Sequence, residues 1–167
     1  MKAVDSRRTV RISLLVALAT VLSIFESQLP IPRPPWLRLG LANIITLIAL
    51  EIYGVKSAVT VACVRSILAG LFGSLPMLIF SFPAALSSSL AMGFVYTITG
   101  KKFSLVGVSI IGAVIHNTTQ LLTAQVILKL SRSSVIFLFP VLILAALISG
   151  LITGLIARYM VKHFPES

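Results

Sequence analysis

The sequence predicts an all-α integral membrane protein, a bundle of six transmembrane helices. Hydrophobic residues make up 57% of the 167-residue chain and charged residues only 11%, with a mean hydropathy of +1.07. A soluble domain normally carries about 25% charged residues, and a soluble core of this size cannot bury so much apolar surface. Six apolar runs, separated by charged residues, proline or glycine, each approach the ~20 residues that a helix needs to cross a bilayer.

The first run covers about residues 10–29 and follows a basic tail. A signal peptide starts similarly, but this run is long, no small-residue cleavage site ends it, and five more runs follow. Small residues spaced by four let helix backbones approach closely. They form either an internal packing seam or a docking surface for another membrane subunit, and they are Ser13 with Ala17 and Ala19 with Ser23.

The second run covers about residues 37–53 and is the shortest, since the four prolines of LPIPRPPW (29–36) exclude regular helix there. That stiff loop, ending at Trp36, is either an anchor or lid, or simply a turn. Asn43 lies on the outer half of the second span. Glu26 ends the first span on the same side, and we expect it to pair with Arg38.

The third run (55–72) carries a charged residue about halfway along its length, Arg65. An arginine near the bilayer centre costs about 2.5–3.5 kcal/mol on insertion scales. Arg65 should therefore face the bundle interior and have a partner. The only cysteine, Cys63, is surrounded by apolar residues and is most simply a packing residue. The fourth run (75–99) follows after a short turn.

The fifth run (103–130) contains five consecutive polar residues, HNTTQ, at 116–120. Helical spacing aligns His116 and Gln120 on one face with Ser109, Gly112, Ala113 and Thr123. The threonines are typical interhelical hydrogen-bonding groups. Ionisable groups inside a membrane favour a functional interpretation, which we extend to His116 with its neighbours Asn117 and Gln120.

In the sixth run (134–161), Ala146, Gly150 and Gly154 recur every four residues and predict internal packing.

The distribution of Lys and Arg predicts the orientation. With the N-terminus inside, nine cations fall on the cytoplasmic side and four outside, while Arg65 belongs to neither. We therefore expect a multi-pass cell-membrane protein with one transmembrane domain (10–162) and two cytoplasmic tails (1–9 and 163–167). The net charge of +10 then reflects orientation and contact with anionic lipid, and not nucleic-acid binding.

These positions predict one polar pocket between the bilayer midplane and the outer surface. Arg65 would neutralise an anion, because a guanidinium suits carboxylate or phosphate. His116, Asn117 and Gln120 would orient the ligand, Asn43 would close the outer side, and Arg38 with the proline-rich loop would gate access. The expected ligand is a small anionic solute with an apolar body.

Several enzyme classes lack their residues in this chain. There is no phosphate-binding GxxxxGK[ST] motif, the only aspartate is Asp5, and no Cys/His spacing suggests zinc. His116 has no acidic or nucleophilic neighbour in sequence for a hydrolytic triad. We expect no enzymatic activity, no metal and no cofactor.

The segments RLGLANIITLIAL (38–50), VRSILAGLFGS (64–74) and GVSIIGAVIHNTTQL (107–121) resemble the heptaprenyl diphosphate synthase component I family, also called the Gx transporter family. That family in turn resembles the substrate-binding S components of energy-coupling-factor (ECF) vitamin transporters. The resemblance covers about residues 10–160, and its most specific parts are Gly-Leu-Ala-Asn at 40–43 and His-Asn-x-x-Gln at 116–120. The family pattern has Lys at position 38 and less polar residues at 118 and 119.

The S-component resemblance implies a six-helix protein that captures a solute outside and docks, through Ser13/Ala17 and Ala19/Ser23, on a transmembrane coupling subunit driven by two ATPases. The rival interpretation is a non-catalytic membrane subunit of heptaprenyl diphosphate or quinone-precursor synthesis. A trans-prenyl synthase holds Mg²⁺ on Asp-rich motifs, which this chain does not contain. A third interpretation is a purely structural scaffold.

Overall fold

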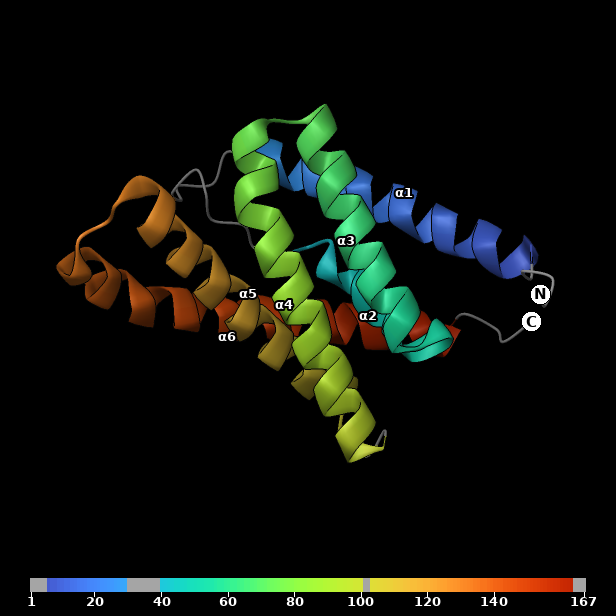
Figure 1. The fold of residues 1–167 in the computed structure, drawn as a ribbon. Helices are drawn as coiled ribbons and strands as arrows, with labels where there is room; N and C mark the ends of the chain where they lie inside the picture. The colour runs from blue at the N-terminus through green and yellow to red at the C-terminus, as the bar shows by residue number, and fades with distance from the viewer. Residues whose placement is uncertain (1–5, 30–39, 101–102, 164–167) are drawn as a thin grey trace.

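The computed structural model describes residues 6–29, 40–100 and 103–163, and within these ranges the secondary structure is entirely helical (Figure 1). The helices are α1 (Ser6–Gln28), α2 (Asn43–Tyr53), α3 (Val55–Phe72), α4 (Leu75–Thr99), α5 (Leu105–Leu128) and α6 (Arg132–His163). Their positions agree with the six apolar runs of the sequence. The proline-rich loop, Trp36 and Arg38 lie outside the described residues, as do most of the two predicted tails.

Five of these helices are long and apolar enough to cross a membrane, which makes the protein a helical membrane bundle. α2 is the exception, because it has only 11 residues. At 1.5 Å per residue it is about 16 Å long, roughly half the ~30 Å thickness of a hydrocarbon core. The described part of the second span is therefore shorter than a helix that crosses the bilayer, and residues 37–39 of the predicted run lie outside the described residues.

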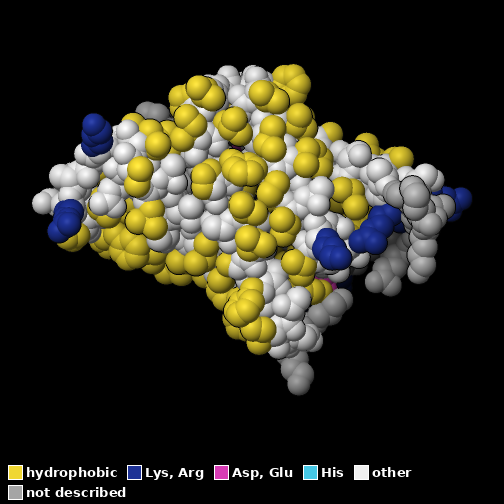
Figure 2. Space-filling view, viewed as in Figure 1, with side chains coloured by type: hydrophobic (Ala, Val, Ile, Leu, Met, Phe, Trp, Pro, Cys, Tyr) yellow, Lys and Arg dark blue, Asp and Glu magenta, His cyan; other side chains and the backbone are white. Residues whose placement is uncertain are grey.

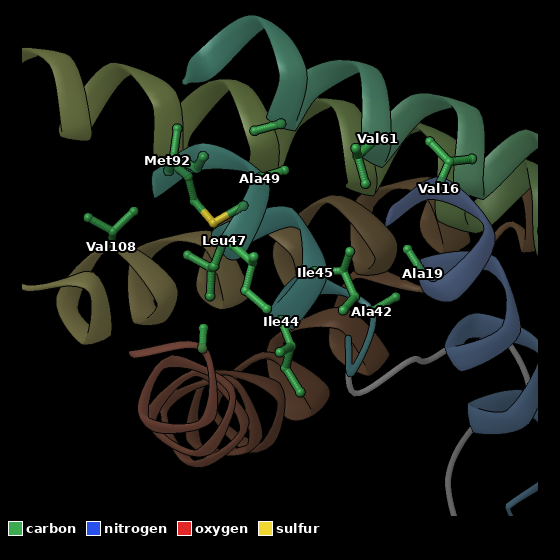
Figure 3. Packing of buried hydrophobic residues seen from close by; sticks show 14 residues of the cluster. Val16, Ala19, Ala42, Ile44, Ile45, Leu47, Ala49, Val61, Met92 and Val108 are labelled. Atoms are coloured by element: carbon green, nitrogen blue, oxygen red, sulfur yellow. The ribbon is translucent and has the colours of Figure 1, made fainter. Parts of the chain in front are cut away.

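The short helix α2 lies at the centre of the bundle (Figure 3). It contacts α3 and α6 most extensively, and α1 and α5 less so. All residues from Asn43 to Leu50 are buried, so even the face of α2 that a spanning helix would turn to lipid is covered. Its apolar side chains, such as Leu47 and Leu50, join Val61 of α3 and Met92 of α4 in the main hydrophobic cluster. α2 is thus part of the core and not a peripheral span.

The outer surface is strongly apolar (Figure 2). On α6, large side chains such as Phe137, Leu144 and Leu151 are exposed, and on α1 Leu14 and Val21 are exposed. Contiguous apolar surface of this extent is unfavourable in water and matches lipid. Lys and Arg side chains lie toward the two ends of the molecule in this view, as expected for residues at the membrane interfaces.

One end of the bundle joins several segments that the charge distribution assigns to the cytoplasm. The first turn of α1 and the last turn of α6 both lie at this end (Figure 1). Arg8 of α1 donates to the Tyr53 carbonyl oxygen at 3.0 Å and to Ser57 Oγ at 3.2 Å, which places the α2–α3 turn there as well. Gly54 makes that turn with a φ of +82°, a left-handed conformation that favours glycine.

Close helix contacts fix the register of consecutive helices. A Cβ atom added to Gly70 of α3 would lie 2.5 Å from Leu78 Cβ of α4, and one added to Gly93 of α4 would lie 2.4 Å from Val55 Cγ1 of α3. α3 and α4 are therefore antiparallel, with Gly70 beside Leu78. Between α4 and α5, a Cβ atom added to Gly112 would lie 2.5 Å from Met92 Sδ.

The predicted packing seam of α6 is confirmed, and its partner is α5. A Cβ atom on Gly150 would lie 2.7 Å from Ile110 Cα, and one on Gly154 would lie 2.8 Å from Val106 Cα. Ala146 is fully buried on the same face. The small residues let the two backbones approach closely, and a hydrogen bond of 2.9 Å between Ser109 Oγ and Thr153 Oγ1 adds a polar contact in the seam.

Candidate functional site

The Arg65 side chain joins three helices inside the bundle. It is only 4% exposed. Its Nη1 donates to Ser23 Oγ of α1 at 3.0 Å, and its Nη2 donates to Asn43 Oδ1 of α2 at 2.9 Å. The expectation that Arg65 faces the interior and has partners is confirmed. Two bonds to different helices orient the guanidinium plane, so this side chain has a defined geometry rather than a mobile one.

Glu26, the last buried residue of α1, lies beside this group. Its carboxylate is 1% exposed and accepts hydrogen bonds from the backbone N–H groups of Gly40, at 3.0 Å to Oε1, and Leu41, at 2.9 Å to Oε2. The predicted pairing with Arg38 falls outside the described residues. Glu26 was not among the site residues predicted from the sequence. A carboxylate at the end of an apolar span could have indicated its role. We refer to Arg65, Ser23, Asn43 and Glu26 as the Arg65 group.

The polar run of α5 is directed toward α4 and α6. His116 is 3% exposed, and its Nδ1 lies 3.5 Å from Ser88 Oγ of α4. Asn117 Nδ2 donates to the Leu142 carbonyl oxygen of α6 at 3.2 Å, and Gln120 is fully buried. These side chains lie on the interior side of the helix, as their spacing predicted. We refer to His116, Asn117, Gln120 and Ser88 as the His116 group.

Two threonines of α5 form structural hydrogen bonds. Thr119 Oγ1 donates to the Ile115 carbonyl oxygen and forms a 2.8 Å hydrogen bond with Ser87 Oγ of α4, while Thr123 Oγ1 donates to the Thr119 carbonyl oxygen. The interhelical role expected of the threonines is confirmed for Thr119, whereas the printed bond of Thr123 stays within α5. Ser87 and Ser88 were missed in the sequence, although three consecutive serines (87–89) in the middle of an apolar run are a visible signal.

The helix registers give the relative heights of the two groups. Gly70 of α3 lies beside Leu78 of α4, and the two helices are antiparallel. Arg65 is five residues before Gly70, so it is level with the residue five positions after Leu78, which is Pro83. His116 lies beside Ser88, so the same counting places Gln120 level with Ala84. Arg65 and Gln120 are thus at nearly one height, and His116 lies four to five residues, ~6–7.5 Å, closer to the α2–α3 turn.

The hydrogen bonds of the two groups lead in different directions. Those of Arg65 reach α1 and α2, whereas that of His116 reaches α4 and that of Asn117 reaches α6. α3 packs on α4 and α4 packs on α5, while α2 contacts α3, α5 and α6, so α2 and α4 both connect the two sides. The single ligand pocket formed by Arg65, Asn43, His116, Asn117 and Gln120 stays a prediction, and Arg38 lies outside the described residues.

The four small residues of α1 divide between two faces. Ala19 is fully buried and Ser23 is 4% exposed, with its hydroxyl engaged by Arg65. Ser13 and Ala17 are exposed, on the same face as Leu14 and Val21. A partner subunit could reach Ser13 and Ala17 in this arrangement, but Ala19 and Ser23 pack inside the chain. The docking surface stays a prediction, and of its four residues only Ser13 and Ala17 are exposed.

A sequence model of the family described as heptaprenyl diphosphate synthase component I matches residues 15–160. The chain belongs to this family. The match runs from α1 to α6 and contains both the Arg65 group and the His116 group. Comparisons with curated proteins and with solved structures found no match. The family membership confirms the first half of the resemblance noted in the sequence, while the likeness to ECF S components is left as a proposal.

Proposed function

We propose that this member of the heptaprenyl diphosphate synthase component I family is a non-catalytic membrane subunit of heptaprenyl diphosphate or quinone-precursor synthesis, and that it holds an anionic ligand at Arg65. The family description supports the pathway. The composition supports the non-catalytic role, because the only aspartate of the chain is Asp5 and Asp-rich Mg²⁺ motifs are missing from the sequence.

The observation that carries the proposal is the buried, oriented guanidinium of Arg65 in the middle of a membrane helix. A charged side chain at this depth is costly and by default marks a functional site. Ser23 and Asn43 orient the guanidinium at 3.0 and 2.9 Å, and an oriented guanidinium binds phosphate oxygens in its own plane. A prenyl diphosphate combines such an anionic head with an apolar tail, which suits a site inside an apolar bundle.

A second candidate is solute uptake as an ECF-type S component. Two observations favour it: polar side chains of all six helices are buried inside the bundle, and the small residues Ser13 and Ala17 are exposed on α1. In this role the chain would bind a small anionic solute and dock on a transmembrane coupling subunit with two ATPase subunits. Both candidates assign an anion to Arg65, and they differ in the ligand and the partners.

The first experiment measures binding of labelled heptaprenyl diphosphate to the full-length protein purified in detergent, with inorganic diphosphate as competitor. Wild type should bind, Arg65→Ala should lose most of the binding, and Arg65→Lys should keep a reduced part. The control is Arg158→Ala, which removes an exposed arginine near the C-terminal end of α6. Equal binding by wild type and Arg65→Ala would remove Arg65 from the site.

The second experiment separates the two candidates. The tagged protein is recovered from solubilised membranes and tested for incorporation of labelled isopentenyl diphosphate into long-chain prenyl diphosphate by the subunits that accompany it. Incorporation that depends on the tagged chain supports the synthesis role. Recovery of a water-soluble anion by mass spectrometry, together with ATP-dependent uptake in cells and no incorporation, would replace it with the transport role.

A further inference from the structure

The start of α2 and the buried part of α1 are connected through a closed circuit of hydrogen bonds. Arg65 donates to Ser23 Oγ and Asn43 Oδ1, the Asn43 N–H donates to the Gly40 carbonyl oxygen at 2.8 Å, and the Gly40 N–H donates to Glu26. Ser23 and Glu26 are three residues apart on α1 and so lie on the same face. The series of hydrogen bonds therefore begins at Ser23 and ends at Glu26, both on α1.

The geometry of residues 40–43 depends on Glu26. Gly40 has a φ of +82°, and a Cβ atom on it would lie 3.0 Å from Asn43 Nδ2. The backbone thus turns sharply at Gly40, next to the side chain that binds Arg65. Both amide groups at this turn, those of Gly40 and Leu41, donate to the Glu26 carboxylate, so the carboxylate holds the turn that presents Asn43.

Burying a carboxylate is costly unless it is hydrogen-bonded, and inside a membrane such groups are rare. Glu26 is only 1% exposed. A neutral amide or hydroxyl would cap one backbone N–H group at lower cost, whereas a carboxylate has two oxygens and accepts only. A glutamate at position 26 can therefore hold both adjacent amides, those of Gly40 and Leu41, and with them the start of α2.

We propose that Glu26 is the positioning residue of the anion site: it holds the Gly40–Leu41 turn, so that Asn43 and Ser23 keep the Arg65 guanidinium aligned for an anionic head group. This inference rests on the proposed anion-binding role of Arg65. Glu26 itself does not contact the ligand. Its effect on binding passes through Asn43 and Arg65, and it should vanish when the planar guanidinium fork is replaced by an ammonium group, which is a point charge with no plane to align.

The experiment measures the dissociation constant for labelled heptaprenyl diphosphate on the full-length protein, with inorganic diphosphate as a second probe of the anionic head alone. Glu26→Gln should weaken binding of both probes about tenfold, because an NH2 donor replaces one of the two oxygens that accept from Gly40 and Leu41. Glu26→Asp, which keeps the charge but is too short to reach both amides, should weaken it similarly. The control, Glu51→Gln, changes a carboxylate at the other end of α2 and should stay within about twofold.

A double-mutant cycle separates positioning from general loss of structure. In an Arg65→Lys background, Glu26→Gln should have little further effect on binding, whereas independent structural effects would add. Should Glu26→Gln fail to fold, Glu26→Asp takes its place in the cycle. Wild-type affinity in either Glu26 variant, tighter binding, or additive effects would overturn the inference. Retained binding in Arg65→Ala would instead overturn the proposed function.

Discussion

Arg65 Nη2 lies 2.9 Å from Asn43 Oδ1, so the middle of α3 is hydrogen-bonded to the first residue of the short central helix α2. This contact explains how an arginine is tolerated in a membrane helix. It also connects two of the sequence segments that carry the family resemblance, 38–50 and 64–74.

Replacing Asn43 by Ala should destabilise the protein by about 1.5–3 kcal/mol, since a hydrogen bond to a charged group is lost and Arg65 stays buried. The measurement is the unfolding free energy in detergent. The control is Thr60→Ala on α3, whose hydroxyl bonds only to the Lys56 carbonyl oxygen on the exposed face. If both variants unfold alike, the Arg65–Asn43 bond has no special energetic role.

Adding a methyl group in the α5–α6 seam should also destabilise the bundle. In Gly150→Ala the new Cβ would lie 2.7 Å from the backbone atom Ile110 Cα, so the helices must move apart. Overpacking of this kind costs roughly 1–3 kcal/mol. Leu151→Phe adds volume on the exposed face of α6 and serves as the control in the same unfolding experiment. A Gly150→Ala protein as stable as wild type would contradict the close seam.

The 2.8 Å bond between Ser87 and Thr119 links α4 to α5 beside the His116 group. Ser87→Ala and Thr119→Val should each cost only about 0.6 kcal/mol, the average for such bonds in membranes. The double variant should cost less than the sum of the two, because both remove the same bond. Strict additivity in unfolding measurements would show that the two hydroxyls act independently.

The orientation can be tested by labelling single cysteines in whole cells with a membrane-impermeant reagent. Cys63, the only cysteine, is first replaced by Ala. Ser131→Cys, between α5 and α6, should be labelled from outside, whereas Lys56→Cys, at the α2–α3 turn, should be labelled only after permeabilisation. The opposite pattern would invert the topology that the Lys and Arg distribution predicts.

Most helices could be predicted from the sequence, because the length of an apolar run and the charges that end it depend on local residues alone. The inward direction of Arg65, His116, Asn117 and Gln120 also followed from the sequence, since a helix has a fixed period and polar side chains avoid lipid. The close approach of α6 through Ala146, Gly150 and Gly154 could be predicted for the same reason, but not that α5 is its partner.

Only the tertiary structure decided which side chains meet. The rotation and the register of one helix against another depend on packing across the whole bundle, and the period of a single helix does not contain them. For this reason the sequence alone did not show that Arg65 binds Ser23 and Asn43, that Glu26 holds the amides of Gly40 and Leu41, or that His116 lies against Ser88. The local composition determined a membrane bundle with buried polar groups, and the arrangement of neighbouring helices determined how those groups are paired.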